Sequence, residues 1–91
     1  MKIIFIGCAK SSFVLLNHCL KINLNIIGIC TKSKSWNNDF VDLNKKFKTK
    51  KIDTIYSNNI NSLKTVNWFK KKKPDLIFCF GWSEILKKKN N

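Results

Sequence analysis

The sequence predicts a small α/β domain built on a parallel sheet with helices on both of its faces. Residues Leu76 to Phe80 form an unbroken apolar run between Pro74 and Gly81, which is typical of a strand buried on both faces. Strand-like and helix-like segments alternate along the chain. This order is typical of domains in which helices pack on both faces of a parallel sheet. Residues 2–31 have the strand–helix–strand order of a βαβ unit with a right-handed crossover.

The first third of the chain is expected to hold two strands and one helix. The strands are Lys2–Ile6 and Asn25–Thr31, because apolar residues follow one another there without alternation. The helix between them, Ser12–Lys21, has apolar residues at i, i+3 and i+7. Ser11 or Ser12 can cap its start, because a serine hydroxyl accepts a hydrogen bond from a free backbone N–H.

The rest of the chain is expected to add two strands and three helical segments. A loop over Thr31–Asn38 comes first. The elements that follow it are a helix over Asp39–Phe47, an edge strand over Ile52–Tyr56, a helix over Ser62–Lys72, the strand Leu76–Phe80 and a helix capped by Ser83. Apolar residues recur at helical spacing in the first two helices. Lysines end the second of them, where positive charge favours the helix dipole. No internal repeat or linker occurs, so residues 1–91 are expected to form one domain.

The chain is strongly basic, with 18 basic residues against five acidic ones and a net charge of +13. All the basic residues are lysine, whereas arginine is the residue that binds guanine edges and phosphates in a bidentate manner. Lysine, asparagine and isoleucine, which are abundant here, have A/T-rich codons. We therefore interpret the positive charge mainly as a result of an A/T-rich gene, and specific nucleic-acid binding is not expected. A small module that binds polyanions is the alternative.

Neither a membrane span nor a metal site is expected. The sequence contains no apolar stretch of about 18 residues and no signal-peptide core, so a cytoplasmic location is expected. Its four cysteines form no C-x-x-C pair and are expected to be reduced. The single histidine, His18, adjoins Cys19 on a predicted helix, where neighbours do not face the same point.

The best candidate site lies where two loops meet. In a doubly wound sheet with the strand order third, second, first and fourth, ligands bind between the first and fourth strands. The loops Gly7–Ser12 and Gly81–Ser83 would then face each other. The first of them lacks a dinucleotide or P-loop pattern, so its helix start either binds an anion or is a plain cap. Trp82 either flanks a planar ligand or belongs to the core.

Four segments also carry a family resemblance, and together they span essentially the whole chain. They are MKIIFIGCAKSSFVLL, NIIGICTKSKS, IYSNNINS and KKPDLIFCFGWSEIL. In order and spacing they resemble the N-terminal domain of the folate-dependent formyltransferases. The last segment is most similar to amino-sugar N-formyltransferases, and methionyl-tRNA formyltransferases are the alternative. The resemblance implies a Rossmann-like sheet, of which this chain would hold the first four strands.

The resemblance also implies a chemistry. The cofactor would be 10-formyltetrahydrofolate, and the acceptor would be the amino group of a nucleotide-linked amino sugar or, alternatively, of a tRNA. The residues matched to the cofactor site are Phe80, Gly81, Trp82, Ile85 and Leu86, and those matched to the acceptor site are Cys8, Ala9, Lys10, Ser11 and Ser12.

No catalytic residue is assigned. The asparagine, histidine and aspartate that the family uses for catalysis lie downstream of the segment matched by Ser83–Leu86, so His18 and Asp75 do not take these roles. We therefore expect an incomplete formyltransferase domain, a fragment that does not transfer formyl groups alone. The open edge of its fourth strand is expected to favour association.

Overall fold

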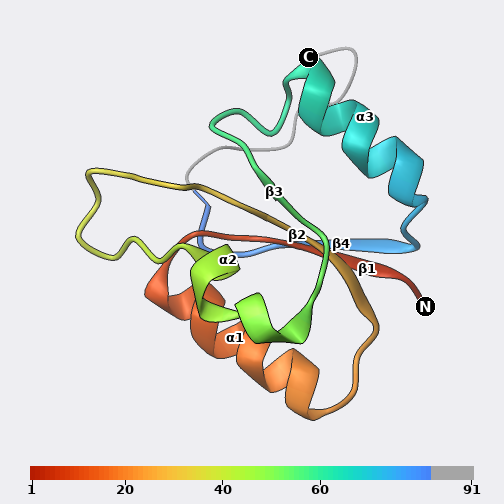
Figure 1. The fold of residues 1–91 in the computed structure, drawn as a ribbon, viewed down its shortest axis with the longest axis horizontal. Coiled ribbons are helices and arrows are strands. Elements are labelled where there is room, and N and C mark those ends of the chain that lie inside the picture. The colour runs from red at the N-terminus through yellow and green to blue at the C-terminus, as the bar shows by residue number, and fades with distance from the viewer. Residues whose placement is uncertain (83–91) are drawn as a thin grey trace.

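The sheet of this protein is parallel throughout. The computed structural model describes residues 1–82. Its strands are β1 (Ile3–Ile6), β2 (Ile26–Thr31), β3 (Thr54–Tyr56) and β4 (Leu76–Cys79). They lie in the order β3-β2-β1-β4, and every neighbouring pair is parallel (Figure 1). The predicted fold class and strand order are confirmed.

Helices cover both faces of the sheet. They are α1 (Lys10–Lys21), α2 (Leu43–Lys46) and α3 (Leu63–Lys72), with a short 3-10 helix η1 (Lys48–Lys50) after α2. In Figure 1, α1 and α2 lie together on one side of the strands and α3 lies on the other. No helix among residues 1–82 has the length and apolar character that crossing a membrane requires.

The central strand β1 supplies both halves of the core. Ile3 and Phe5 pack in one apolar cluster with residues of α1 and α2, and Ile4 and Ile6 pack in a second cluster with Phe69 of α3. This division follows from the strand geometry, because successive side chains point to opposite faces. Unlike an outer strand, β1 is buried along its whole length.

Helix α1 starts earlier than predicted. It begins at Lys10, with Ala9 as its N-cap, so the expected cap by Ser11 or Ser12 is wrong. The neighbouring chain segment takes over part of the capping, because the Lys10 N–H donates to the Asp39 carbonyl oxygen over 2.9 Å. Inside the first turn, the Ser12 hydroxyl accepts a hydrogen bond from the Ala9 N–H.

The helix predicted over Asp39–Phe47 is reduced to α2. The Asp42 carboxylate accepts hydrogen bonds from the N–H groups of Asn44 and Lys45, so the helix starts after Asp42. Upstream, Phe40 forms a single antiparallel bridge with Ala9, which keeps its backbone extended. A tertiary contact thus prevents the earlier start that the apolar spacing indicated.

Two further expectations are corrected at the outer elements. The sequence allows Asn61 or Ser62 as the cap of α3 and predicts an apolar stripe of Leu63, Val66 and Phe69. Ser62 is the cap, but Leu63 is 76% exposed, and the buried residues of α3 are Thr65 and Phe69. Strand β4 is not buried on both faces, because Leu76 and Cys79 are exposed. In the described chain β4 pairs with β1 alone, which leaves its other edge open. The helix expected to start at Ser83 lies outside the described residues.

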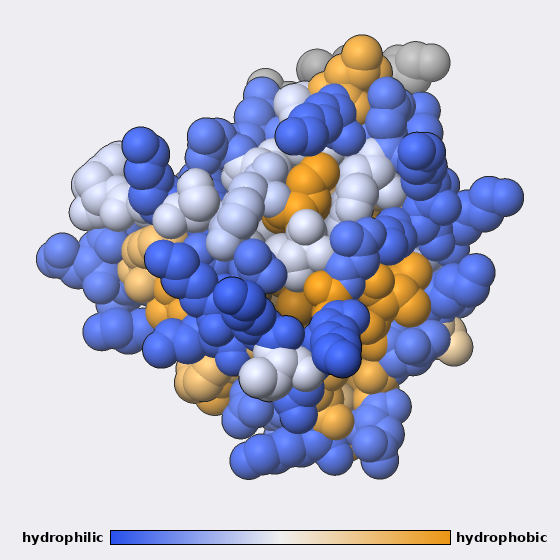
Figure 2. All heavy atoms as spheres, viewed as in Figure 1, coloured by the Kyte–Doolittle hydropathy of each residue, from blue (hydrophilic) through white to orange (hydrophobic). Residues whose placement is uncertain are grey.

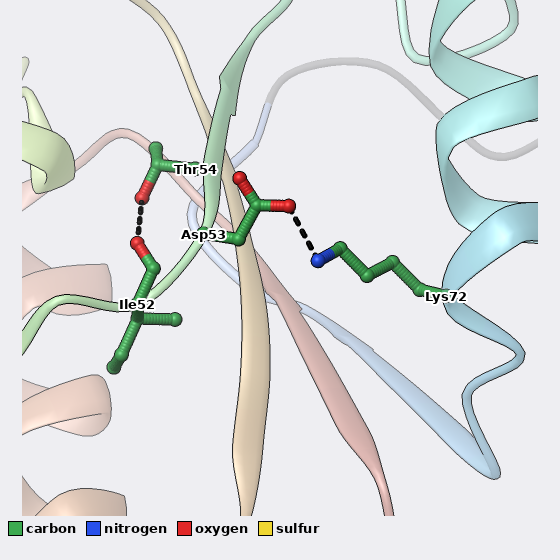
Figure 3. Close-up of polar contacts among 4 residues, drawn as sticks. All are labelled: Ile52, Asp53, Thr54 and Lys72. Carbon is green, nitrogen blue, oxygen red and sulfur yellow. Dashed lines mark hydrogen bonds and ion pairs between the residues drawn. The ribbon is translucent and has the colours of Figure 1, made fainter.

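An ion pair joins the start of β3 to the end of α3. The Asp53 carboxylate pairs with the Lys72 ammonium group, and the Thr54 hydroxyl donates to the Ile52 carbonyl oxygen over 3.0 Å (Figure 3). The Asp53 side chain is 54% exposed. A pair this exposed contributes at most about 1 kcal/mol, so its main effect is to orient the end of α3.

Helix α3 packs closely on β2 through a glycine. A Cβ atom on Gly28 would lie 2.7 Å from the Trp68 ring, which is closer than real Cβ contacts. The Lys72 ammonium group lies 5.6 Å from the centroid of the same ring. The absent side chain at Gly28 therefore makes room for Trp68 between the helix and the sheet.

We expect Gly28→Ala to lower the free energy of unfolding by about 2 kcal/mol, because the added methyl group overpacks this contact. Urea unfolding followed by circular dichroism measures the change. The same substitution in a Trp68→Phe background should cost less, since the smaller ring leaves space. An equal cost in both backgrounds would show that the two residues are not coupled.

Candidate functional site

The candidate site lies at the carboxyl ends of β1 and β4, where the strand order reverses. The Cys8 N–H donates to the Gly81 carbonyl oxygen over 3.1 Å, which joins the loop after β1 to the residues after β4. The Phe80 N–H donates to the Ile6 carbonyl oxygen over 2.9 Å and continues the strand pairing up to this point. The two loops therefore face each other as predicted. In open parallel sheets this is the position where ligands bind.

The Ser12 hydroxyl fastens the two loops together. It accepts a hydrogen bond from the Ala9 N–H over 3.1 Å and donates one to the Phe80 carbonyl oxygen over 2.6 Å. The Ser12 side chain is fully buried. Because the Ser12 hydroxyl is hydrogen-bonded to backbone groups of both loops, the structure supports a role for this serine in holding the fold together rather than in binding an anion.

Gly7 and Gly81 lack the side chains that would fill the space occupied by the Ser12 hydroxyl. A Cβ atom on Gly7 would lie 2.5 Å from both the Ser12 hydroxyl oxygen and the Phe80 carbonyl oxygen. A Cβ atom on Gly81 would also collide with the Ser12 hydroxyl, and the backbone φ of Gly81 is +72°. That conformation is open to glycine at little cost. Both loop positions therefore require glycine.

A pocket of about 270 Å³ opens beside these loops, and we call it the switch-point pocket. Its walls come from three segments that follow three different strands. The lining residues are Cys8 and Ala9 after β1, Lys32, Ser35, Asn37, Asp39 and Phe40 after β2, and Gly81 and Trp82 after β4. The pocket thus joins the ends of all three adjacent strands.

The wall after β2 is held by backbone hydrogen bonds. The Lys10 N–H donates to the Asp39 carbonyl oxygen, and the Val41 N–H donates to the Cys8 carbonyl oxygen, each over 2.9 Å. The Asp39 N–H in turn donates to the Asn37 side-chain oxygen over 2.9 Å. Although much of this segment is exposed, its far end is fixed against the start of α1.

Lys32 interacts with two other residues that line the pocket, Trp82 and Cys8. The Lys32 ammonium group lies 4.9 Å from the centroid of the Trp82 ring, a cation–π distance. Burial raises the pKa of the Cys8 thiol, and the positive charge of Lys32 partly offsets this rise. The thiol donates to the Gly81 carbonyl oxygen over 3.6 Å. Cys8 is therefore a neutral hydrogen-bonding group near pH 7 rather than a thiolate nucleophile.

The residues predicted for the site are divided among several places. Cys8, Ala9, Gly81 and Trp82 line the switch-point pocket. Phe80 and Ser11 instead line a second hollow of about 540 Å³ beside α1, together with Val14, Leu15 and His18. Lys10 is exposed and Ser12 is buried. Ile85 and Leu86 lie outside the described residues.

The sequence pattern does not predict the pocket wall formed by residues 32–40. Lys32 and Asp39 belong to a polar stretch without periodicity, which was predicted only as a loop and a helix start. The signal that could have found them is their position after β2, because the ends of neighbouring parallel strands share one edge of the sheet.

No catalytic constellation is found among the described residues. Residues 1–82 contain no cluster of side chains suited to bind a metal ion, and their four cysteines form no disulfide bond. His18 is exposed on α1 and does not line the switch-point pocket. What the pocket offers is binding and orientation.

A further hollow lies over α3. It measures about 670 Å³ and is lined by Ile55 of β3 and by Lys64, Asn67, Trp68, Lys70 and Lys71 of α3. None of these residues follows a strand end, so this hollow is off the edge where parallel sheets bind ligands. Figure 2 shows hydrophilic side chains over much of the visible face, with hydrophobic groups between them.

Comparison with known proteins gives one informative relative. No protein-family model matches the chain. The chain is 29% identical over 89 residues to the bifunctional polymyxin resistance protein ArnA of Wigglesworthia glossinidia brevipalpis. The similarity covers 94% of this chain but 14% of that protein, so the chain spans a small part of the relative's length.

We expect Ser12→Ala to lower the free energy of unfolding by about 1 kcal/mol, because it removes the hydrogen bonds to the partly buried Phe80 carbonyl and Ala9 N–H groups. Ser11→Ala is the matched control, since Ser11 is an exposed neighbour on the same turn, and it should change stability by less than about 0.5 kcal/mol. Urea unfolding measures both. Equal effects of the two substitutions would contradict the assigned role of Ser12.

We expect the pKa of Cys8 to lie above that of an ordinary thiol and to rise further in Lys32→Gln, because Lys32 favours the thiolate. A higher pKa moves the onset of alkylation by iodoacetamide to higher pH, since the thiolate is the reactive form. The rate is measured against pH in a chain that keeps Cys8 as its single cysteine. Lys34→Gln, an exposed control, should leave the profile unchanged, and an unchanged profile in Lys32→Gln would contradict the placement of Lys32.

Proposed function

We propose that this chain is the N-terminal part of a 10-formyltetrahydrofolate-dependent formyltransferase that acts on an amino group. One observation carries the proposal. The segments that the family resemblance assigns to cofactor and acceptor are joined by the hydrogen bond from Cys8 to Gly81, and Cys8 and Ala9 of one line a pocket together with Gly81 and Trp82 of the other. The similarity to a bifunctional resistance protein over 94% of the chain supports a role as one part of a larger enzyme.

The end of β4 fits the flat ring system of a folate. Trp82 lines the pocket and also packs against the core cluster that contains Ile4 and Ile6. Stacking on an aromatic ring stabilises a planar heterocycle. Gly81 has no side chain, so its backbone stays accessible at the pocket wall. In this proposal Gly81 and Trp82 hold the cofactor, with Phe80, Ile85 and Leu86 as further contacts. The bound cofactor supplies the formyl group.

The loop after β1 then faces the acceptor. Cys8 and Ala9 line the pocket opposite Trp82, so an acceptor on this side would meet a cofactor held at the end of β4. A nucleotide-linked amino sugar is the proposed acceptor, since the last of the four segments is most similar to the amino-sugar branch of the family. The residues described here orient the reacting groups, which by itself accelerates a reaction between two bound molecules.

The removal of the amine proton is assigned to another part of the enzyme. An amine that attacks a formyl carbon must lose a proton, and this requires a base within hydrogen-bond reach. His18 is exposed on α1 and does not line the pocket, so it does not meet this condition. As the family resemblance implies, the proposed base lies downstream of the described residues.

The proposal predicts that the 91-residue chain binds 5-formyltetrahydrofolate, a stable analogue of the cofactor. Trp82→Ala should weaken this binding about tenfold, because a stacking ring contributes about 1–3 kcal/mol. Trp36→Ala is the matched control, since the Trp36 side chain is 96% exposed and lines none of the hollows described. Isothermal titration calorimetry gives the affinities.

Two results would overturn the assignment of the cofactor site. One is the absence of any measurable binding of the folate analogue by a chain that circular dichroism shows to be folded. The other is binding that Trp82→Ala and Trp36→Ala weaken to the same extent.

A further inference from the structure

The switch-point pocket contains one positive and one negative side chain, Lys32 and Asp39. Among residues 1–82 a direct ion pair joins Lys72 to Asp53, and none joins Lys32 to Asp39. The chain has only five acidic residues against 18 basic ones. An acidic side chain at this pocket is therefore not explained by the overall composition.

Both charged side chains extend from backbone that is held in place. Lys32 directly follows Thr31, a fully buried residue whose hydroxyl oxygen accepts a hydrogen bond from the Leu43 N–H over 3.2 Å. The ammonium group of Lys32 is then located over the Trp82 ring. Asp39 is fixed on both sides, because its N–H donates to Asn37 and its carbonyl oxygen accepts from Lys10. The backbone of both residues is thus fixed in the pocket wall, and Asp39 itself is exposed to solvent.

The size and the remaining polar groups of the pocket limit its ligand. A volume of about 270 Å³ is just below the roughly 300–1,000 Å³ typical of pockets for drug-sized ligands. Ser35 and Asn37 add neutral hydrogen-bonding groups to the wall. A single polar ring with charged substituents fits this description better than an extended apolar molecule.

We propose that the switch-point pocket binds an amino sugar phosphate through its two opposite charges. Lys32 binds a phosphate group, since an ammonium group pairs with phosphate oxygens, and Asp39 binds the amino group in its ammonium form. The inference rests on the proposed function and names the residues that select its acceptor. Asp39 would repel a phosphate, so its presence favours a ligand that also carries a positive group over a bare polyanion. Lys32 and Asp39 are specificity residues in this account, and neither is assigned a proton transfer.

The test compares three small sugars on the full 91-residue chain by isothermal titration calorimetry. Glucosamine 1-phosphate carries both groups, glucose 1-phosphate lacks the amine, and glucosamine lacks the phosphate. We expect glucosamine 1-phosphate to bind about fivefold more tightly than either of the others, because each partly exposed ion pair contributes up to about 1 kcal/mol. Equal affinities for the three sugars overturn the proposal without the use of any variant.

Two charge-neutral variants then assign the preferences to residues. Lys32→Gln should lose the preference for the phosphate and keep that for the amine, whereas Asp39→Asn should show the reverse. Each variant is thus a control for the other, and Lys34→Gln, exposed on the same loop, should keep both preferences. A Lys32→Gln chain that still prefers the phosphate, or an Asp39→Asn chain that still prefers the amine, overturns the assignment.

Binding of 5-formyltetrahydrofolate separates this inference from the proposed function. If the chain binds the folate analogue but does not distinguish the three sugars, the charge pair has no role in selecting the acceptor and the formyltransferase proposal stands. If it distinguishes the sugars but does not bind the folate analogue, the formyltransferase proposal fails and the charged pocket stands.

Discussion

The hydroxyl group of Ser12 is the contact on which the rest of the candidate site depends. It is fully buried and links the Ala9 N–H at the start of α1 to the Phe80 carbonyl oxygen at the end of β4. Gly7 and Gly81 have no side chains where this hydroxyl sits. Because one serine connects two loops about 70 residues apart in sequence, it fixes the geometry of the edge at which parallel sheets bind ligands.

This contact gives the switch-point pocket two of its walls, and the third comes from residues 32–40. Backbone hydrogen bonds tie the far end of that segment to the start of α1, while Lys32 lies over the Trp82 ring. The pocket therefore combines a flat ring, a thiol held neutral by burial and two opposite charges. These groups bind and orient a polar ligand, which agrees with the proposed role in presenting an amine to a formyl donor.

The architecture could be predicted from the sequence because it depends on apolar runs and on general rules. The run Ile3–Ile6 indicated a central strand, and the strand order followed from the way parallel sheets are connected. The details of the site depend instead on contacts between distant residues. Neither the start of α1 at Lys10 nor the exposure of β4 follows from local periodicity. Lys32 and Asp39 looked like ordinary loop residues, because only the fold brings them to Trp82 and Cys8.

The most direct test of the central claim, that the loops after β1 and β4 form one ligand site, is an amide chemical-shift map. The isotope-labelled chain is titrated with 5-formyltetrahydrofolate, and the shifts of backbone and indole N–H groups are followed by NMR. The account predicts that the signals of Cys8, Gly81 and Trp82 move together along one binding curve. Shifts confined to the lysines of α3, or a response of Trp82 without Cys8, would contradict it.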